Sequence, residues 1–413
     1  MSNRILIPQG YKNSPLGIIP KEWEVKRIGD FGKVITGSTP PTNDLTNYGS
    51  SYKFVGPIDI TDRKYIGKTE KSLSEKGFAL SRCMPKNTIL FTCIGSTIGK
   101  CAIADEDLTS NQQINAVICN TNHNYEFLYY ELSNRSEKIR KIAAEQAVPI
   151  INKSTFENYK IVCPPLSEQK NIANILCLWD TAIEKQSELI EKLKLRKRAL
   201  MQQLLTGKKR LPGFSGEWKC IKLGEIAERV TRKNEEDNKN VVTISAQRGF
   251  VVQTDFFNKS VASEALDNYF LILKDEFCYN KSYSNGYPMG AIKRLTAFDK
   301  AVVTTLYICF KLKELSNINI DFFEQYCESG IFNKELVKVA NEGGRAHGLL
   351  NVTPSDFFNM HMRIPNLDEQ NVIATVLVNA DKEIELAHEK LAGLQSQKRG
   401  LMQQLLTGKK RII

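Results

Sequence analysis

The chain has 413 residues, and its 57 lysines and arginines outnumber its 46 aspartates and glutamates, which gives a formal net charge of +11. This length predicts two or three domains, and 42% hydrophobic with 25% charged residues exclude a disordered chain. The positive net charge favours a polyanionic partner, because a positive field attracts phosphate.

Residues Met1–Pro8 lack the apolar stretch of a signal peptide, and the longest apolar-rich run, Ala301–Phe310, is too short to span a bilayer. We therefore expect a cytoplasmic protein. The ten cysteines include no Cys-x-x-Cys pair, so buried, reduced thiols are expected rather than disulfides. None of the four histidines pairs with a histidine or cysteine at zinc spacing, so no metal site is expected.

The first predicted domain covers residues 12–165 and has a mixed α/β composition. It opens with Trp23 and the segment Ile28-Gly29-Asp30-Phe31. The β-branched and aromatic run Thr88–Ile94 predicts a strand, and Tyr125–Ala144 predicts a helix.

Three polar loops of this domain carry groups suited to DNA. Glycine lets the backbone approach closely, Ser, Thr and Lys reach phosphate, and Asn and Gln can pair with adenine through two hydrogen bonds. The candidate DNA-binding residues here are Ser38, Thr39, Ser96, Thr97, Lys100, Asn111, Gln112 and Gln113. The alternative is that these are ordinary surface loops.

A helical region over residues 166–210 follows. Pro164 ends the preceding segment, Ser167 is the expected N-cap, and Glu168 suits the positive end of the helix dipole. Gly207 follows the last apolar positions, as a C′ glycine does. About 40 residues at 1.5 Å each would give a helix about 60 Å long.

The second predicted mixed α/β domain covers residues 212–365. It opens like the first, with Trp218 and Leu223-Gly224-Glu225-Ile226, but its middle shares almost nothing with the first domain. Strand-forming runs occur at Val241–Ile244 and Ala301–Phe310, and Asp321–Val339 predicts a helix. Its polar, aromatic and cationic loops supply the DNA-binding candidates Lys281, Ser282, Tyr283, Asn285, Tyr287, Lys293, Arg294, Arg345 and His347.

The last region, residues 366–411, repeats the first helical region at an offset of 201 residues. Leu200–Arg210 and Leu401–Arg411 are identical over eleven residues, and Leu-Ser-Glu-Gln at 166–169 matches Leu-Asp-Glu-Gln at 367–370. The expected ends repeat too, with Asp368 as N-cap and Gly408 as C′ residue. Two copies this similar are expected to do similar work.

Apolar residues in each copy alternate at steps of four and three, which predicts a coiled-coil seam. The seam includes Ile172, Leu176, Ile183, Leu193 and Leu200 in the first copy, and Ile373, Leu377, Ile384, Leu394 and Leu401 in the second. Lys197 and Lys398 occupy the same seam position, where a polar residue can fix register. Each helix could pair with the other copy or dock a foreign helix, and a bundle would allow both.

Motifs for catalysis are missing. Gly95–Cys101 resembles a phosphate loop, but it has three residues between its glycines and Cys101 in place of Ser or Thr. No Asn-Pro-Pro-Tyr-like methyltransferase motif occurs, and Asp62-Arg63-Lys64 lacks a second carboxylate at nuclease spacing, which predicts a solvated turn. No catalytic residue is therefore assigned.

The arrangement resembles the specificity subunits of Type I restriction-modification systems over nearly the whole chain. The resemblance rests on the leader Pro20-Lys21-Glu22-Trp23, on Pro-Pro-Leu-Ser-Glu-Gln at 164–169, on the repeated LMQQLLTGKKR ending and on Leu211–Phe214. Fragments at 96–99, 111–115, 281–286 and 347–351 look like recurring recognition-domain elements.

The resemblance implies an α+β fold, in which two target recognition domains are joined by two long helices in an antiparallel coiled coil with pseudo-two-fold symmetry. It implies a non-catalytic subunit that recognises a bipartite, asymmetric target in double-stranded DNA. Two methyltransferase subunits would bind S-adenosylmethionine, and two restriction subunits would bind ATP and Mg²⁺. The alternatives are a coiled-coil scaffold with two protein-binding domains and a single-chain methylating nuclease, which the missing motifs disfavour.

Overall fold

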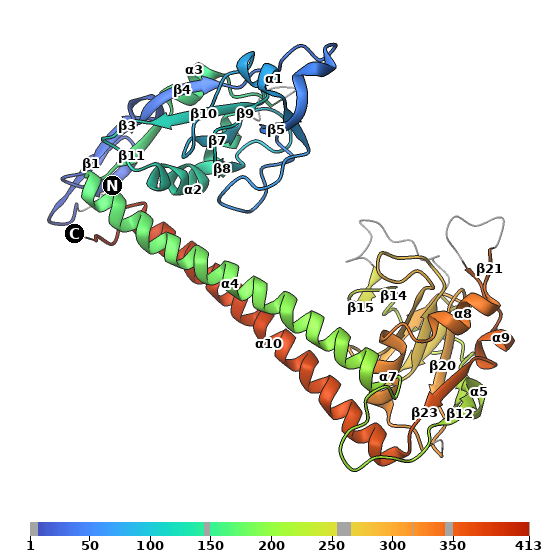
Figure 1. The fold of residues 1–413 in the computed structure, drawn as a ribbon. Coiled ribbons are helices and arrows are strands. Elements are labelled where there is room, and N and C mark those ends of the chain that lie inside the picture. Colours follow the sequence, from blue (N-terminus) through green and yellow to red (C-terminus); the bar gives the residue numbers. More distant parts are fainter. Residues whose placement is uncertain (1–6, 144–148, 254–265, 316, 343–349, 413) are drawn as a thin grey trace. The chain divides into compact units, whose positions relative to one another are not determined.

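The computed structural model describes residues 7–143, 149–253, 266–315, 317–342 and 350–412, and the thin grey trace of Figure 1 marks the rest. The chain forms two units. Unit 1 comprises residues 1–186 and 390–413, and unit 2 comprises residues 187–389. Each unit therefore contains one mixed domain and parts of both long helices.

The mixed domain of unit 1 is built from short strands and a few helices. Its strands are β1 (Tyr11–Ser14), β2 (Gly17–Pro20), β3 (Glu24–Arg27), β4 (Gly32–Thr36), β5 (Tyr48–Val55), β6 (Lys71–Leu73), β7 (Ile89–Thr92), β8 (Cys101–Ile103), β9 (Thr109–Ser110), β10 (Ile114–Cys119) and β11 (Lys160–Cys163). Its α-helices are α1 (Glu75–Ala79), α2 (Tyr125–Ala143) and α3 (Lys153–Asn158). Strands β4, β10, β7 and β8 form an antiparallel sheet in that order.

Unit 2 repeats this plan with other residues. Its strands are β12 (Lys219–Lys222), β13 (Ala227–Arg229), β14 (Val242–Ser245), β15 (Gly249–Val252), β16 (Phe270–Leu273), β17 (Phe277–Asn280), β18 (Ala291–Arg294), β19 (Lys300–Val303), β20 (Ile308–Leu312), β21 (Asn341–Glu342), β22 (Leu350–Asn351) and β23 (His361–Ile364). Its short helices are α5 (Leu223–Ile226), α7 (Ile320–Glu328), α8 (Asn333–Val339) and α9 (Pro354–Phe358). The antiparallel sheet β13-β20-β17-β18 has the same strand order as its counterpart in unit 1.

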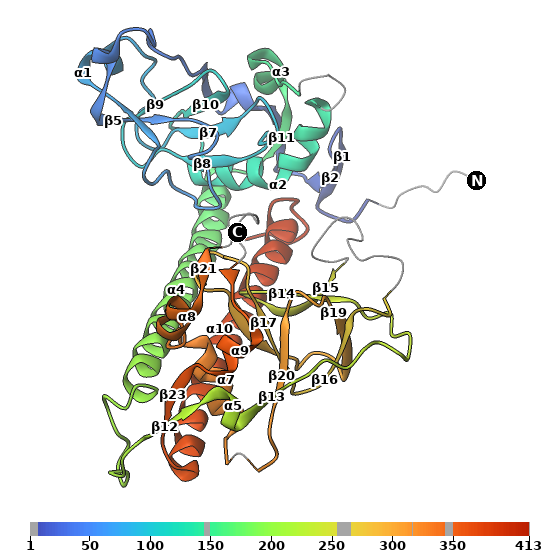
Figure 2. The same cartoon turned by 90° about the vertical axis from the view of Figure 1, so that its right-hand side faces the viewer.

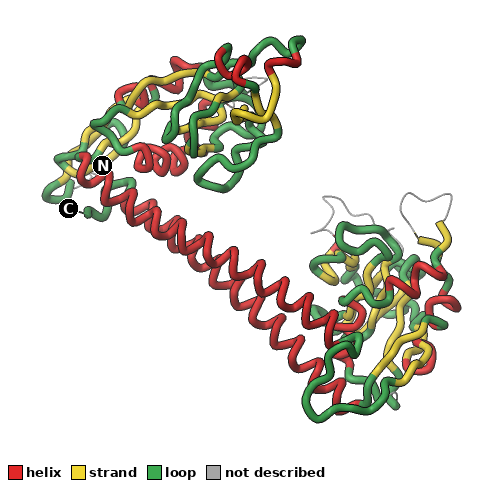
Figure 3. The backbone as a smooth tube through the Cα atoms, in the orientation of Figure 1, coloured by secondary structure: helices red, strands yellow, loops and turns green. Residues whose placement is uncertain are grey.

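Two helices of 39 residues each confirm the predicted long helices, α4 (Leu166–Leu204) and α10 (Leu367–Leu405), which run side by side in Figure 3. Lys398 pairs with Asp180 in unit 1, and Lys197 pairs with Asp381 in unit 2, so the helices are antiparallel. In each unit, one end of α4 and one end of α10 belong to the hydrophobic core. Examples are Leu176 and Leu405 in unit 1, and Leu204 and Leu377 in unit 2.

The seam residues predicted from the heptad pattern are buried or half-buried in both helices. Near the domain of unit 1, Ile172 and Leu176 are fully buried, and near the domain of unit 2, Ile373 and Leu377 are at most 1% exposed. Leu193 and Leu394, in the middle of the helices, are half-buried.

The helix ends confirm one prediction and correct another. Gly207 and Gly408 both adopt a φ of 70°, which is favourable for a C′ glycine. Ser167 and Asp368 are not N-caps, because each helix begins one residue earlier. In α10 the cap is Asn366, whose Oδ1 accepts the N–H of Glu369 at 2.9 Å.

Two further predictions need correction. The helix expected over Asp321–Val339 is two helices, α7 and α8, because Gly330 adopts a φ of 73° between them. The run Ala301–Phe310 forms two strands in different sheets, β19 and β20, rather than one. The predicted helix Tyr125–Ala144 is confirmed as α2 over Tyr125–Ala143.

Candidate nucleic-acid interface

The loops chosen from the sequence of the first domain meet at one edge of the unit 1 sheet. In the antiparallel order β4-β10-β7-β8, the end of β4 adjoins the start of β10, and the end of β7 adjoins the start of β8. Residues 37–39, 94–100 and 111–113 occupy these connections. We call this set of loops the loop edge of unit 1.

Hydrogen bonds join these loops to one another. The Thr39 hydroxyl donates to Oε1 of Gln112 at 2.7 Å, and the N–H of Ser38 donates to the Ser110 carbonyl at 2.8 Å. Gly37 leaves no room for a side chain, since a Cβ there would lie 2.1 Å from the Asn111 carbonyl oxygen. Glycine is therefore required at Gly37 for the first and third loops to pack together.

A cavity of about 590 Å³ opens at the loop edge of unit 1. Thr97, Lys100, Asn111 and Gln113 line it together with Phe54, Gly56, Pro57, Ile58, Asp59, Glu70 and Lys71. Ser96 is exposed on the same loop as Thr97, and Gln112 is exposed beside the cavity-lining Gln113. All eight candidates of the first domain thus belong to one surface region.

In unit 2 the equivalent edge lies at the ends of β13 and β17 and the starts of β20 and β18. The loop 281–290 joins β17 to β18 there, and the N–H of Leu350 donates to the Lys281 carbonyl at 3.1 Å. This contact joins the two fragments that the family resemblance singled out. We call loop 281–290, Arg229 and the hairpin residues 246–248 the loop edge of unit 2. Figure 2 shows the strands that carry these loops, β14, β15 and β17, close together.

Lys281 and Arg229 bring two positive charges together at the loop edge of unit 2. Burial lowers the pKa of Lys281, and the nearby Arg229 lowers it further. No described carboxylate lies within ion-pair distance of either cation. Tyr283 is 65% exposed on the same loop, while Ser282 and Asn285 flank it. Two adjacent positive charges without a carboxylate form a site that an anion would stabilise.

Lys293 and Arg294, in contrast, are engaged inside unit 2. Lys293 is 9% exposed and pairs with Glu328, whose carboxylate also accepts the Tyr287 hydroxyl at 2.8 Å. Arg294 pairs with Asp275, Asp321 and Glu324. These carboxylates neutralise both cations, which makes them weaker candidates for DNA phosphate than Lys281. Arg345 and His347 lie outside the described residues.

Three residues missed from the sequence belong to the loop edge of unit 2. Gln247 and Arg248 form the exposed tip of the β14–β15 hairpin, and Nε2 of Gln247 donates to the Asn285 carbonyl at 2.9 Å. Arg229 is the third missed residue. The run Val241–Ile244 predicts the first strand of the hairpin, but only the fold brings the hairpin tip to loop 281–290.

Each domain is fixed to the long helices by a repeated set of contacts. In unit 1, Glu168 accepts the indole N–H of Trp23 at 2.9 Å and two hydrogen bonds from Arg411 at 2.7 and 2.9 Å. In unit 2, Glu369 accepts the indole N–H of Trp218 at 3.3 Å and two hydrogen bonds from Arg210, each 2.6 Å long. We call each set a Trp–Glu–Arg clamp.

The glutamine after each glutamate makes a second repeated contact. Oε1 of Gln169 accepts the N–H of Asn124 at 2.9 Å, and Oε1 of Gln370 accepts the N–H of Asn319 at 3.0 Å. Both asparagines place their side-chain oxygen 2.8 Å from a backbone N–H in the first turn of α2 or α7. The Glu-Gln pair in the sequence repeat therefore positions the domain helix against the long helix.

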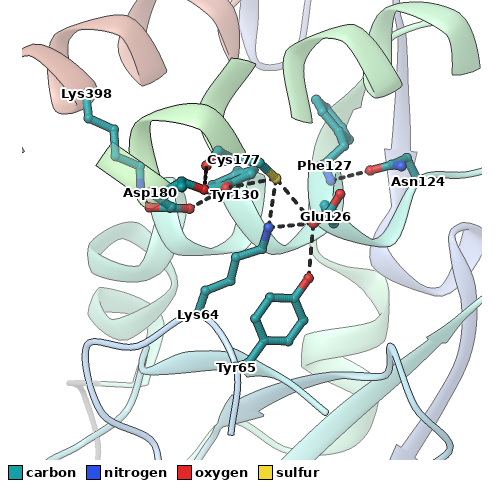
Figure 4. A network of polar contacts seen from close by, with 10 residues as sticks. Lys64, Tyr65, Asn124, Glu126, Phe127, Tyr130, Cys177, Asp180 and Lys398 are labelled. Atoms are coloured by element: carbon teal, nitrogen blue, oxygen red, sulfur yellow. Dashed lines mark hydrogen bonds and ion pairs between the residues drawn. The ribbon is translucent and has the colours of Figure 1, made fainter. Parts of the chain in front are cut away.

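A polar network extends this attachment in unit 1 (Figure 4). Asp180 of α4 accepts hydrogen bonds from the Tyr130 hydroxyl and from Lys398 of α10. Lys64 lies 2.5 Å from Oε1 of Glu126 and 2.8 Å from the sulfur of Cys177. Burial opposes its charge, but the hydrogen bonds to Cys177 and Glu126 leave the pKa of Lys64 raised. The solvated turn predicted for Asp62-Arg63-Lys64 is thus wrong for Lys64, whose side chain is 11% exposed.

Other expectations from the sequence can be placed as well. All ten cysteines are free, although Cys83 and Cys220 are exposed rather than buried. Among the described residues, no group of three or more His, Cys, Asp and Glu side chains has the geometry to hold a metal ion. In the part of the chain that the structure describes, no helix combines the length and hydropathy needed to cross a membrane.

The repeated clamps and loop edges define a class of protein in which two similar domains present variable loops from a shared pair of antiparallel helices. The family of the Type I restriction modification DNA specificity domain matches residues 20–195 and 215–396, so the chain belongs to this family. It is a DNA specificity subunit of a Type I restriction-modification system, the subunit without a catalytic role.

Relatives from Methanocaldococcus jannaschii support the assignment. The MjaVIII specificity subunit is 25% identical over 420 residues, which cover 95% of this chain and 94% of the relative. The MjaIX specificity subunit is 35% identical over 196 residues, and that match covers only 45% of each chain.

Solved structures show the same fold at low sequence identity. The crystal structure of the S subunit from M. genitalium matches with a TM-score of 0.54 and 17% identity, covering 93% of this chain and 96% of that chain. A chain of a type I R-M system studied for its complex assembly matches with a TM-score of 0.57 and 14% identity, covering 95% and 99%. The α+β fold with two recognition-domain-like halves and two packed long helices is thereby confirmed.

Proposed function

We propose that this chain recognises a bipartite, asymmetric target in double-stranded DNA, one block with each loop edge. The observation that carries the proposal is the shared sheet order of the two units beneath loops of unrelated sequence. Because the two sheets have the same strand order, each loop edge lies at the same place on its own sheet. Different side chains at the two edges would then select different bases. The target should therefore consist of two different short blocks with a fixed gap.

The candidate DNA-binding residues fall into three groups under this proposal. Those of the first unit act together, because they surround one cavity edge. In the second unit, Lys281, Ser282, Tyr283 and Asn285 form the primary contact surface with Gln247 and Arg248. Tyr287, Lys293 and Arg294 support that surface through their ion pairs and hydrogen bonds to carboxylates.

The partners supply the chemistry in this proposal. Two methyltransferase subunits would bind S-adenosylmethionine and methylate adenine, and two restriction subunits would bind ATP and Mg²⁺ and cleave DNA. Base flipping for methylation would belong to the methyltransferase. We place the complex in the cytoplasm, where the chromosome and an incoming DNA molecule are accessible. The domain limits that accompany the proposal are 12–165, 166–210, 212–365 and 366–411.

Exposed leucines on the helices support docking of the methyltransferase. Leu178 and Leu195 of α4 are 70% and 58% exposed, and Leu386 of α10 is 63% exposed. These side chains lie outside the seam, so they are available to a partner helix. Replacing Leu195 and Leu386 with Gln should abolish co-purification with the methyltransferase while leaving the coiled coil folded. Normal co-purification would exclude this surface.

An exchange experiment tests the main proposal. Residues 215–363 would be replaced by those of another Type I specificity subunit, and the host DNA would be sequenced for modified adenines. We expect one block of the target to change while the other block and the gap stay the same. A palindromic or continuous methylated site in the parent system would contradict one loop edge per block. A coiled-coil scaffold with two protein-binding domains would instead show no sequence-specific DNA binding in the complex.

A further inference from the structure

The cavity at the loop edge of unit 1 contains a pair of amides whose orientation the backbone determines. Oδ1 of Asn111 accepts the backbone N–H of Gln113 at 3.0 Å, so Nδ2 of Asn111 must point the other way. That Nδ2 group donates to Oε1 of Gln113 at 3.0 Å. A flip of either amide would set two donors or two acceptors against each other.

This arrangement leaves Gln113 with its amino group as the available partner for a ligand. Its carbonyl side is already engaged by Asn111, and its backbone is held by the hydrogen bond from the N–H of Cys93 to its carbonyl oxygen at 2.8 Å. A glutamine that recognises adenine through two hydrogen bonds must present an oxygen and an amino group together. Because Asn111 already occupies one lone pair of its oxygen, Gln113 is less suited to that task than its residue type alone predicts.

The other groups around the cavity select between the remaining ligands. Lys71 and Lys100 line it, and neither has an ion-pair partner among the described carboxylates. Asp59 also lines it, but its two oxygens accept the N–H groups of Gly56 at 2.7 Å and Glu70 at 2.8 Å. The cavity therefore offers hydrogen-bond donors and two lysines, and its carboxylates are Asp59, whose oxygens are occupied by backbone N–H groups, and the exposed Glu70.

We infer that this cavity binds a backbone phosphate of the DNA rather than reading a base, with Gln113 and Lys100 as donors and Asn111 as the positioning residue. A guanine edge also presents acceptors only and can bind a lysine, but it is uncharged, so a phosphate makes the stronger, charge-assisted hydrogen bonds with Lys71 and Lys100. Phosphate also accepts from the amino group of Gln113. The inference rests on the proposed function and assigns the unit 1 cavity to positioning the DNA rather than to its specificity.

The test uses the full chain purified with its methyltransferase subunits and a library of duplexes in which the first target block is randomised. Two variants address the amide, Gln113→Met and Gln113→Glu, and Lys100→Gln addresses the charge. Asn122→Asp is the matched charge control, because Asn122 is exposed in the connection after β10, at the opposite end of that strand from Gln113. The dissociation constant is measured for each duplex at several salt concentrations.

We expect Gln113→Glu to weaken binding of every duplex by about tenfold and Gln113→Met by a few-fold, because charge-assisted hydrogen bonds are lost. Lys100→Gln should lower the slope of log affinity against log salt by about one, since one phosphate contact is removed. Base preference in the first block should stay unchanged in all variants, and Asn122→Asp should bind like the wild type. Recognition of the second block by each variant shows that it is folded.

A changed base preference at one position of the first block in Gln113→Met would overturn the inference, because Gln113 would then be a base reader. Unchanged affinity in both Gln113→Glu and Lys100→Gln would overturn it as well, because the cavity would lie outside the DNA contact. A wild-type complex without any sequence preference would instead contradict the proposed function, so the two failures are distinguishable.

Discussion

Units 1 and 2 share an arrangement of strands and helices that their sequences do not reveal. Their main sheets have the same antiparallel strand order, and in the chain each sheet is followed by helices, a closing strand and a long helix, although unit 2 adds β21, β22 and α9 before its closing strand. The closing strand pairs with an early strand in both units, β11 with β3 and β23 with β12. The recurring side chains are those that attach each domain to the long helices.

The units differ in the ion pair near the start of the helix that follows the sheet, α2 in unit 1 and α7 in unit 2. In unit 1, Lys64 from a loop pairs with Glu126 of α2, while in unit 2, Arg294 from β18 pairs with Asp321 of α7. The position of the ion pair relative to the domain helix is the same, but the chain segment that supplies the cation differs. The ion pair near the start of the domain helix is thus made with different residues in the two units.

The Trp–Glu–Arg clamps provide the largest expected effect. Glu168→Ala should reduce the free energy of unfolding by about 3 kcal/mol, because it leaves the fully buried indole N–H of Trp23 and part of the Arg411 charge without a partner. Glu369→Ala should cost about 2 kcal/mol, since Trp218 is half-buried and can bind water. Urea unfolding followed by the fluorescence of Trp23 and Trp218 measures both. Equal losses would show that the clamps are equivalent despite their different burial.

The sequence predicted the repeated parts of the molecule well. The long helices, their seam and their C′ glycines follow from periodicity and from residues whose roles are local, such as Gly207 and Gly408. The clamps were not predicted, because Glu168 was interpreted through the helix dipole, whereas its partners Trp23 and Arg411 are distant in sequence. Pairing between residues far apart in the chain has no periodic signature.

The candidate site was predicted in composition but not in detail. The polar loops were identified from Gly, Ser, Asn and Lys content, yet the sequence could not show that, among the described residues, Lys293 and Arg294 meet carboxylates while Lys281 does not. It also could not show the orientation of Gln113, which depends on a backbone contact to Asn111. Charge and hydrogen-bonding capacity are local properties, but their availability to a ligand is set by the fold.

Lys281 and Lys293 of unit 2 should differ in their contribution to DNA binding. Lys281→Ala should weaken DNA binding by the complex several-fold and lower the salt slope by about one, because none of the described carboxylates neutralises its charge. Lys293→Ala should leave the salt slope unchanged and destabilise unit 2, because Glu328 loses its buried partner. Titrations at several salt concentrations, together with thermal unfolding, separate the two roles. Equal salt slopes for the two variants would contradict the distinction.

The ion pairs of the two seam lysines, Lys398 in unit 1 and Lys197 in unit 2, should differ in strength by a smaller amount. Double-mutant cycles with Lys398→Met and Asp180→Asn should give a coupling energy of about 1 kcal/mol, and the cycle for Lys197 and Asp381 a smaller one. The reason is exposure, since the Asp180 side chain is 26% exposed and the Asp381 side chain 42%. The measurement is urea unfolding of the four proteins in each cycle. A larger coupling for Lys197 would mean that solvent exposure does not control the strength of these pairs.

The smallest expected effect is a pH dependence of stability, which we expect in unit 1 but not in unit 2. Burial against Phe31, with the positive charge of Lys26 nearby, lowers the pKa of His123 from its ordinary value of 6.5. Because the folded-state pKa is the lower one, the unfolded chain binds more protons just below pH 6.5. The stabilising contribution of neutral His123 is therefore complete above pH 6.5 and is lost as the pH falls through the folded-state pKa.

Thermal unfolding between pH 7.5 and 5.5 should thus show a modest weakening of unit 1 that His123→Gln removes. The range is chosen to lie above the titration of ordinary carboxylates. Asn120, whose Oδ1 lies 2.8 Å from Nδ1 of His123, stays able to accept a hydrogen bond from the Gln side chain, so the variant should fold. In unit 2, His361 is exposed beside Glu335 and provides the control, since His361→Gln should leave the pH dependence of unit 1 intact. A pH dependence that persists in His123→Gln would assign the effect to another group.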